Sequence, residues 1–343
     1  MQELVVGEVV GVRARIALIR FESGQMEIVG QARFERGDSQ QFEERIRAFL
    51  TGFPEAPREA AFAVGGPVEG QHARITSDSF VVSARQLQRR HGFSSVLLKN
   101  DFVAMALGSM FCPAEAFSTV AEGAGDADSA IVTVGPNAGL GMAILQKIDG
   151  RWQAFESEGG HQAYAACDLD EMELWRALLP GRNYITFEDV ISAEGVCAAY
   201  RVFAQVNGER AVLQNFEEVV AAALAGASPA AVKACQVVAR SLATFAGDAC
   251  LAAGARAGVV IAGALAKALA PFLHDQGVVQ RFRRRGPMTL YVADIPVRLL
   301  EDDTAVWRGL AHAVRYAEQG GVAARAWPAS AARPAMNAPL LRS

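Results

Sequence analysis

A short pattern of strand, glycine turn and strand occurs twice in this chain, and it constrains the fold more than any other feature. The first copy is "VVGEVVGVRARIAL" at residues 5–18, and the second is "SAIVTVGPNAGLGMAILQ" at residues 129–146. Each copy begins a segment in which apolar strands and helical stretches are mixed, as in α/β lobes. With 343 residues, the chain is long enough for two such lobes. We therefore expect two similar α/β lobes with a ligand cleft between them, because open α/β sheets bind ligands at strand ends.

Hydrophobic periodicity gives the order of the remaining elements. Further strands are predicted at residues 26–34, 95–102 and 289–300, and within 60–68, where Gly65-Gly66-Pro67 ends the strand. Residues 257–269 are predicted to form a strand, a turn of small residues and a helix. Helices are predicted at residues 39–51 behind a Ser39 cap, 83–91 behind Ser83, 102–110, through most of 170–253, and at 303–318. Residues 319–343 are rich in Ala, Pro and Arg, lack periodicity, and are predicted to be disordered.

Charge and composition argue against several classes of partner. A net charge of −4 gives no general attraction to nucleic acid or to an anionic membrane. The N-terminus lacks a basic region followed by an apolar stretch, so no signal peptide is predicted. The Ala-rich stretches near 219–226 and 249–270 are interrupted by glycine, charge or proline, so no membrane span is predicted.

Cysteines and arginines give two more expectations. The five cysteines are odd in number and never in CxxC spacing, which favours buried reduced thiols in a cytoplasmic protein over disulfides or a zinc site. They are Cys112, Cys167, Cys197, Cys235 and Cys250. The run Arg281, Arg283, Arg284 and Arg285 is expected to be a solvated loop between two elements.

Six motifs together resemble those of bacterial glucokinases, which have the two-lobed actin-like, ribonuclease H-like ATPase fold. They are "GEVVGVRARIAL", "KNDF", "GPNAGLG", "EGGH", "FEDVISAEG" and "VIAGAL", and they occur in the family's order and spacing between about residues 3 and 318. The resemblance implies a small lobe of residues 1–112 plus 303–318 and a large lobe of residues 113–302. It implies transfer of the ATP γ-phosphate to the 6-hydroxyl of glucose, with Mg-ATP as the donor, and a homodimer.

The sugar half of the family pattern is complete. The resemblance implies that Asp101 is the catalytic base, which would remove the proton of a sugar hydroxyl. Taken alone, Asp101 could instead cap the helix that follows it. The implied sugar-binding residues are Asn100, Asp101, Glu158, His161 and Glu188. Gly159 and Gly160 would let the backbone approach the sugar ring.

One nearby segment departs from the family. In "TSDSF", Ser77 and Phe80 stand where the family has Asn and Trp, which affects the expected sugar specificity.

The nucleotide half of the pattern is altered. In the first phosphate turn, Glu8 replaces the aspartate that places Mg²⁺, Val10 replaces a glycine, Val12 replaces a threonine, and Arg13 replaces an asparagine. In the second turn, Asn137 and Ala138 replace a glycine and a threonine; we expect Asn137 to keep the turn shape by accepting a left-handed backbone. The implied nucleotide-side residues are Glu8, Gly11, Arg13, Asn137, Ala138, Gly139 and Gly263, with Glu8 as a possible Mg²⁺ ligand.

Three functions are compatible with these motifs. The first is a glucokinase that phosphorylates glucose or a similar hexose, weakened by its altered turns. The second is a sugar sensor or partner-binding protein that has lost efficient phosphoryl transfer and signals by lobe closure. The third keeps the chemistry but takes its phosphoryl group from another donor, such as polyphosphate.

Overall fold

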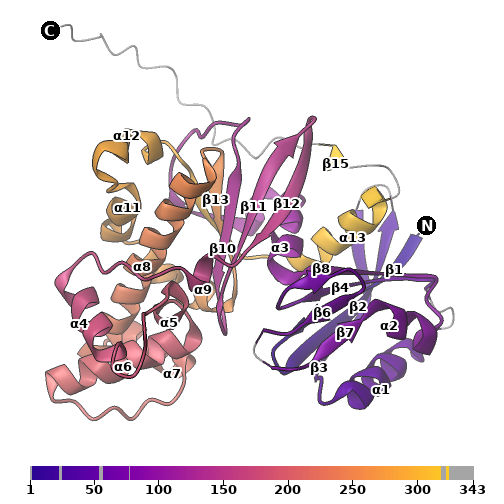
Figure 1. Cartoon of the computed structure of the whole chain (residues 1–343), viewed down its shortest axis with the longest axis horizontal. Coiled ribbons are helices and arrows are strands. Elements are labelled where there is room, and N and C mark those ends of the chain that lie inside the picture. The colour runs from indigo at the N-terminus through magenta and orange to yellow at the C-terminus, as the bar shows by residue number, and fades with distance from the viewer. Residues whose placement is uncertain (1, 23–24, 54–56, 77, 318–321, 324–343) are drawn as a thin grey trace, which may run out of the picture.

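The computed structural model describes residues 2–22, 25–53, 57–76, 78–317 and 322–323. It contains two large sheets, one at each side of a central pair of helices (Figure 1). The five-stranded sheet has the order β3-β2-β1-β4-β8, and the seven-stranded sheet has the order β15-β12-β11-β10-β13-β14-β9. The duplicated hairpin predicted from the sequence therefore lies in two different sheets: β1 pairs with β2 in one, and β10 pairs with β11 in the other, both antiparallel.

The N-terminal half is built around the five-stranded sheet. Its strands are β1 (Gln2–Val10), β2 (Arg13–Glu22), β3 (Gln25–Glu35), β4 (Glu59–Val64) and β8 (Ser95–Asn100). Strand β1 pairs in parallel with β4, and β4 with β8. Helices α1 (Ser39–Leu50) and α2 (Ala84–His91) belong to the same half, with a small antiparallel sheet of β5 (Val68–Glu69), β6 (His72–Arg74) and β7 (Val81–Ser83).

The C-terminal half is built around the seven-stranded sheet. Its strands are β9 (Phe117–Ala121), β10 (Ile131–Pro136), β11 (Leu140–Ile148), β12 (Arg151–Ser157), β13 (Gly258–Ile261), β14 (Val297–Leu300) and β15 (Val322–Ala323). The helices are α4 (Leu169–Leu178), α5 (Phe187–Val190), α6 (Ala193–Asn207), α7 (Phe216–Leu224), α8 (Pro229–Ala253), α9 (Ala264–Ala268), α10 (Ala270–Leu273), α11 (Gln276–Arg283) and α12 (Thr289–Val292). Three 3₁₀ turns complete the set: η1 (Ala114–Ala116), η2 (Gly159–His161) and η3 (Gly286–Met288).

Helices α3 (Asp101–Ser109) and α13 (Ala305–Ala317) join the two halves (Figure 1). Val103 and Leu107 of α3 pack in the core under the seven-stranded sheet, whereas Trp307 of α13 packs in the core of the five-stranded sheet. The two helices touch through glycine: a Cβ at Gly108 would lie 1.7 Å from the Ala305 carbonyl oxygen, and one at Gly309 would lie 1.9 Å from that of Ala104. The division into lobes at residues 112 and 303 stays a prediction.

Two details of the predicted elements are wrong. Helix α1 is capped by Asp38 rather than Ser39, because the Asp38 carboxylate accepts from the Gln41 amide at 2.8 Å in a capping box. Residues 289–300 do not form one strand. A strand would turn Leu290 and Val292 to the same face, yet Leu290 is 88% exposed and Val292 is fully buried. That stretch is one helical turn, α12, followed by the short strand β14.

Most of the tail predicted to be disordered, residues 319–343, lies outside the described residues. Its described part, Val322–Ala323, forms strand β15 against Arg151 and Trp152, which the sequence did not predict. Of the five cysteines, four are buried as predicted, and Cys167 is exposed, contrary to the prediction. In the described part of the chain, no single helix is long and apolar enough to cross a membrane; only the bent pair α7 and α8 passes that test together.

The expected solvated arginine loop is wrong for Arg281, Arg283 and Arg285. Arg281 and Arg283 belong to helix α11, and Arg283 donates to the Glu122 carbonyl oxygen at 2.7 Å. Arg281 donates to Glu171 at 2.7 Å and to Asp168 at 2.5 Å, and so connects α11 to α4. Arg285 donates to the carbonyl oxygens of Thr244 and Ala243, at 2.7 and 3.1 Å, in the middle of α8. Their partners lie far away in the sequence, so the local pattern of the arginine run could not reveal them.

Replacing Arg281 with methionine should therefore destabilise the protein strongly. Glu171 has no exposed side-chain surface, and burial raises its pKa. Without Arg281 its carboxyl group loses its cationic partner, which costs about 3–5 kcal/mol for a buried pair. Urea unfolding measures the loss, with Arg284→Met at the exposed neighbouring position as the control. A loss below about 1 kcal/mol for Arg281→Met would show that the pair does not support the fold.

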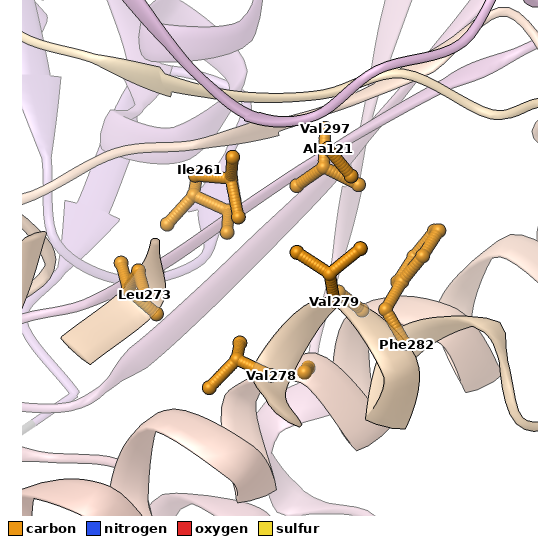
Figure 2. A pocket seen from close by; sticks show the side chains of 10 residues that line it. Ala121, Ile261, Leu273, Val278, Val279, Phe282 and Val297 are labelled. Carbon is orange, nitrogen blue, oxygen red and sulfur yellow. The ribbon is translucent and has the colours of Figure 1, made fainter. Parts of the chain in front are cut away.

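The core of the C-terminal half contains a small apolar cavity between α11 and strands β13 and β14. Val278, Val279 and Phe282 of α11 line it from one side, opposite Ile261 and Val297 (Figure 2). Its volume is about 10 Å³, at the lower limit for one water molecule. The side chains that line the cavity are apolar, so they offer a water molecule no hydrogen-bond partner. The cavity is therefore a packing gap rather than a ligand site.

Candidate functional site

Asn100 and Asp101 stand where strand β8 ends and helix α3 begins. The helix cap is Asn100, whose Oδ1 accepts from the amides of Phe102 and Val103 at 2.9 and 3.1 Å. Asp101 is the first helical residue, and its Oδ1 accepts from the Phe102 amide at 3.0 Å. The residue that caps α3 is therefore Asn100 and not Asp101, and the bond from the Phe102 amide uses only one oxygen of the Asp101 carboxylate.

Negative charge and burial act together on Asp101. Burial, followed by the charges of Glu8 and Glu158, raises the pKa of Asp101 from 3.8 to about 7. Glu8 comes from β1 in the N-terminal half and Glu158 from the C-terminal half, so residues of both halves act on this carboxyl group. A carboxyl group with a pKa near neutral pH suits a general base, because it is ionised at working pH and still holds a proton well.

Glu158, His161 and Glu188 form a second group of polar side chains. His161 Nε2 lies 3.8 Å from Glu158 Oε2, and His161 Nδ1 lies 4.0 Å from Glu188 Oε1. Both distances exceed a hydrogen bond, so these side chains keep capacity for a ligand. The backbone holds them in register: the Phe187 amide donates to the Gln162 carbonyl at 3.0 Å, beside His161 on one side and Glu188 on the other.

Glu188 is tied directly to the second glycine turn. Its Oε2 accepts from the Leu140 amide at 2.7 Å. A Cβ at Gly139 would lie 2.4 Å from the same oxygen. Gly139 is therefore needed for the approach of Glu188, so this turn also shapes the predicted sugar side.

The two glycines of "EGGH" have a packing role, and the expected approach of a sugar to their backbone stays a prediction. A Cβ at Gly159 would lie 2.5 Å from the Met142 sulfur, and one at Gly160 would lie 2.2 Å from the Leu140 carbonyl oxygen. Their small size lets η2 pack closely on strand β11. This packing places Glu158 and His161, whether or not a ligand approaches the backbone.

The first turn is a tight two-residue hairpin loop. Val10 pairs with Arg13, and between them Gly11 has a φ of +55°. A positive φ at the first loop position alone fits a type II′ turn, which favours glycine there. Val12 is 63% exposed, and Val10 packs beside Gly65, where a Cβ would lie 3.3 Å from Val10 Cγ1. The two valines therefore fit the turn without a left-handed backbone.

Glu8 is engaged by Arg15, a contact that the sequence did not indicate. Arg15 Nε donates to Glu8 Oε2. The same guanidinium donates to the Asp303 carbonyl oxygen at 2.7 Å and lies 4.9 Å from the ring centre of Trp307. Arg15 thus connects the carboxylate of β1 to the start of α13.

The expectation that Asn137 shapes the second turn with a left-handed backbone is wrong. In the described part of the chain, Asp149 is the non-glycine residue with positive φ, so Asn137 is not left-handed. Its amide donates to the Gly139 carbonyl at 2.7 Å, and its own carbonyl accepts from the Ala193 amide at 2.9 Å. Gly263 abuts the end of β10: its φ is +106°, and a Cβ there would lie 2.7 Å from the Pro136 carbonyl oxygen. Gly263 therefore lies next to the second turn.

The residues fit a magnesium ion that arrives with a nucleotide better than a resident metal ion. In the part of the chain that the structure describes, no group of three or more His, Cys, Asp or Glu side chains could hold a metal. Magnesium bound with a nucleotide needs only one or two carboxylates besides phosphate oxygens and waters. Glu8 is the carboxylate that would hold such an ion, and its charge acts on Asp101.

Solved structures resemble this chain over nearly its whole length. A glucokinase from an Antarctic psychrotroph matches with a TM-score of 0.78 and 26% identity, covering 92% of this chain and 99% of the other. A glucokinase from Balamuthia mandrillaris in complex with glucose matches with a TM-score of 0.79 and 18% identity, covering 92% and 94%. A ROK-family glucokinase from Streptomyces griseus with glucose and AMPPNP matches with a TM-score of 0.63 and 16% identity, covering 91% and 99%. The fold is that of the two-lobed, actin-like sugar kinases, as predicted.

Sequence comparisons are more specific. The family model for glucokinase matches residues 5–317. A glucokinase from Hahella chejuensis is 29% identical over 318 residues, 92% of this chain and 98% of the relative. One from Chromobacterium violaceum is 32% identical over 241 residues, 70% and 69%. The chain belongs to the glucokinase family.

Proposed function

We propose that this protein transfers the γ-phosphate of ATP to the 6-hydroxyl of glucose, with Asp101 as the base. The observation that carries the proposal is the Asp101 carboxyl group, whose pKa is raised to about 7 beside Glu8 and Glu158. Family membership supports it, as do the glucose and AMPPNP in the Streptomyces griseus structure.

Each side chain has a separate part in this reaction. Glu158, His161 and Glu188 would hold sugar hydroxyls, since carboxylates and imidazole form hydrogen bonds with them. Asp101 would take the proton of the attacking hydroxyl as the phosphoryl group is transferred. Magnesium, when bound, would neutralise phosphate charge, and Glu8 is the carboxylate that would hold it.

A second function is favoured by the nucleotide side. Glu8 forms an ion pair with Arg15. Val10 and Val12 replace the glycine and the threonine of a phosphate-binding turn, so the turn lacks the open backbone of the glycine and the hydroxyl group of the threonine. A protein that binds sugar but transfers phosphate poorly would act as a sugar sensor. Another phosphoryl donor is the third possibility.

Titration calorimetry separates these functions. The first experiment titrates glucose, and the second titrates Mg-ATP into glucose-saturated protein, followed by an assay of glucose 6-phosphate. Binding of both ligands with product formation supports the kinase. Glucose binding without nucleotide binding or product rejects the kinase and supports the sensor. Turnover with polyphosphate alone would support a different donor.

Gly139→Ala should weaken glucose binding by about 10- to 100-fold. The new Cβ would meet Glu188 Oε2 and break its bond from the Leu140 amide. A hydrogen bond to a charged group contributes about 1.5–3 kcal/mol, which sets this range. The Kd for glucose measures the effect, and Gly52→Ala at an exposed position is the control. An unchanged Kd would remove Glu188 from the sugar site.

The homodimer and the cytoplasmic location are also proposals. Family membership supports both as expectations. Light scattering during size-exclusion chromatography measures the mass in solution, and a monomer at all concentrations would contradict the homodimer.

A further inference from the structure

We infer that Arg36 is a positioning residue that ties the first turn, at Gly11 and Val12, to the sugar-side residues Asp78 and Phe80. This inference rests on the proposed function, because it assigns the two ends of the connection to the nucleotide and to the sugar. Arg36 lies at the end of β3, far from any of the six motifs, and it is only 6% exposed.

On the nucleotide side, Arg36 holds both residues of the turn. Its Nε donates to the Gly11 carbonyl oxygen at 2.8 Å, and its backbone amide donates to the Val12 carbonyl oxygen at 3.0 Å. Its Nη1 donates to the Gly37 carbonyl at 2.7 Å, which fixes the guanidinium plane. The carbonyl groups of the turn are therefore held by one side chain and its own backbone.

On the sugar side, the same guanidinium holds the segment that precedes β7. Its Nη2 donates to Asp78 Oδ2, and its Cζ lies 3.9 Å from the ring centre of Phe80. Asp78 in turn accepts from the Phe80 amide at 2.7 Å. A charge-assisted hydrogen bond and a cation–π contact, both strong interactions, therefore join this segment to the same guanidinium that holds the turn.

The segment continues to the candidate base. The Thr76 amide donates to the Gly65 carbonyl at 3.1 Å, and Asn100 Nδ2 donates to the Gly66 carbonyl at 3.2 Å. The Ile75 amide donates to the Phe80 carbonyl at 3.0 Å. Hydrogen bonds, short runs of described backbone and the Arg36 guanidinium thus link Asn100 to the carbonyl oxygen of Gly11. A sugar that moves the segment carrying Asp78 and Phe80 would move the first turn with it.

Hydrogen exchange in the ligand-free protein tests the holding of the turn. In Arg36→Gln, amides in the peptide covering residues 9–18 should exchange at least tenfold faster than in wild type, because a bond to a charged group is lost. Arg20→Gln, which breaks a half-buried ion pair with Glu3 on the same sheet, should leave this peptide unchanged. Equal exchange in Arg36→Gln and wild type would overturn the inference even if no ligand binds.

Exchange with and without glucose tests the connection. In wild type, glucose should slow exchange in residues 75–83 and in residues 9–18; in Arg36→Gln it should slow only the former. In the turnover assay, the same variant should raise KM for ATP about tenfold and KM for glucose less than threefold. Protection of both peptides in Arg36→Gln would overturn the connection. No protection anywhere in wild type would instead contradict the proposed function, while the ligand-free comparison still decides whether Arg36 holds the turn.

Discussion

Replacing Asp101 with asparagine is expected to lower kcat by about 10²- to 10⁴-fold, the contribution of a general base. Asparagine has the same size and can still accept from the Phe102 amide, so the start of α3 should stay intact. What it lacks is a group that takes a proton. For wild type we expect kcat/KM to rise with pH through an apparent pKa near 7, since Asp101 must be ionised to act.

The same substitution should stabilise the folded protein at high pH. The folded-state pKa of Asp101 is about 7, against an ordinary 3.8, so the folded protein holds this proton more tightly than the unfolded chain does. Stability contributed by the group is therefore present at about pH 4 and is lost as pH rises to 7. The upper limit is about 4 kcal/mol, and partial exposure lowers the expected gain of Asp101→Asn to about 1–3 kcal/mol at pH 8.

Turnover and urea unfolding at pH 4 and pH 8 measure both effects. Asp128→Asn is the matched control, because its side chain is 88% exposed. A kcat within threefold of wild type would exclude Asp101 as the base. A stability gain that is the same at both pH values would show that the Asp101 pKa is not raised.

Restoring the first phosphate turn is expected to raise turnover with ATP by about 10²- to 10³-fold. The variant carries Glu8→Asp, Val10→Gly and Val12→Thr. Val12 is 63% exposed, so threonine fits and presents its hydroxyl group to a ligand. One donor placed at developing negative charge contributes about 3–4 kcal/mol to transition-state stabilisation. Adding Ala138→Thr, at an exposed position of the second turn, should increase turnover further.

The control for this variant is Val12→Ala, which removes the branched side chain but adds no hydroxyl group. Steady-state kinetics with ATP compares the two variants. In urea unfolding, the restored variant should lose about 0.5–1 kcal/mol of unfolding free energy, because Val10→Gly places a glycine in a strand. Turnover unchanged from wild type would mean that Arg13 and Asn137 already bind the phosphates by another geometry. It would also remove the argument for a weakened enzyme.

The sequence predicted the elements well where the hydrophobic periodicity and the turn residues indicate the same structure. The hairpins β1–β2 and β10–β11 were predicted because alternating apolar residues flank a glycine turn. Residues 289–300 were predicted wrongly because one helical turn and a short strand give the same apolar run.

Contacts between distant segments could not be predicted from local patterns. Arg281 meets Glu171 across 110 positions, and Arg36 meets Asp78 across 42. The family resemblance assigned Asp101, Glu8 and Glu158 to the site, but it did not predict that the two glutamates would raise the pKa of Asp101.

The glycine contact between α3 and α13 has a mechanical consequence. With no side chains between Gly108 and Ala305 or between Gly309 and Ala104, the two helices cross in direct backbone-to-backbone contact, which we call the crossing point. Asp101 precedes Gly108 by seven residues of helix, a lever arm of about 10 Å. If α3 rotated by roughly 10° about the crossing point, the Asp101 backbone would move only about 2 Å. Closure around a ligand would thus swing the outer parts of each half widely while the proton acceptor stays near its axis.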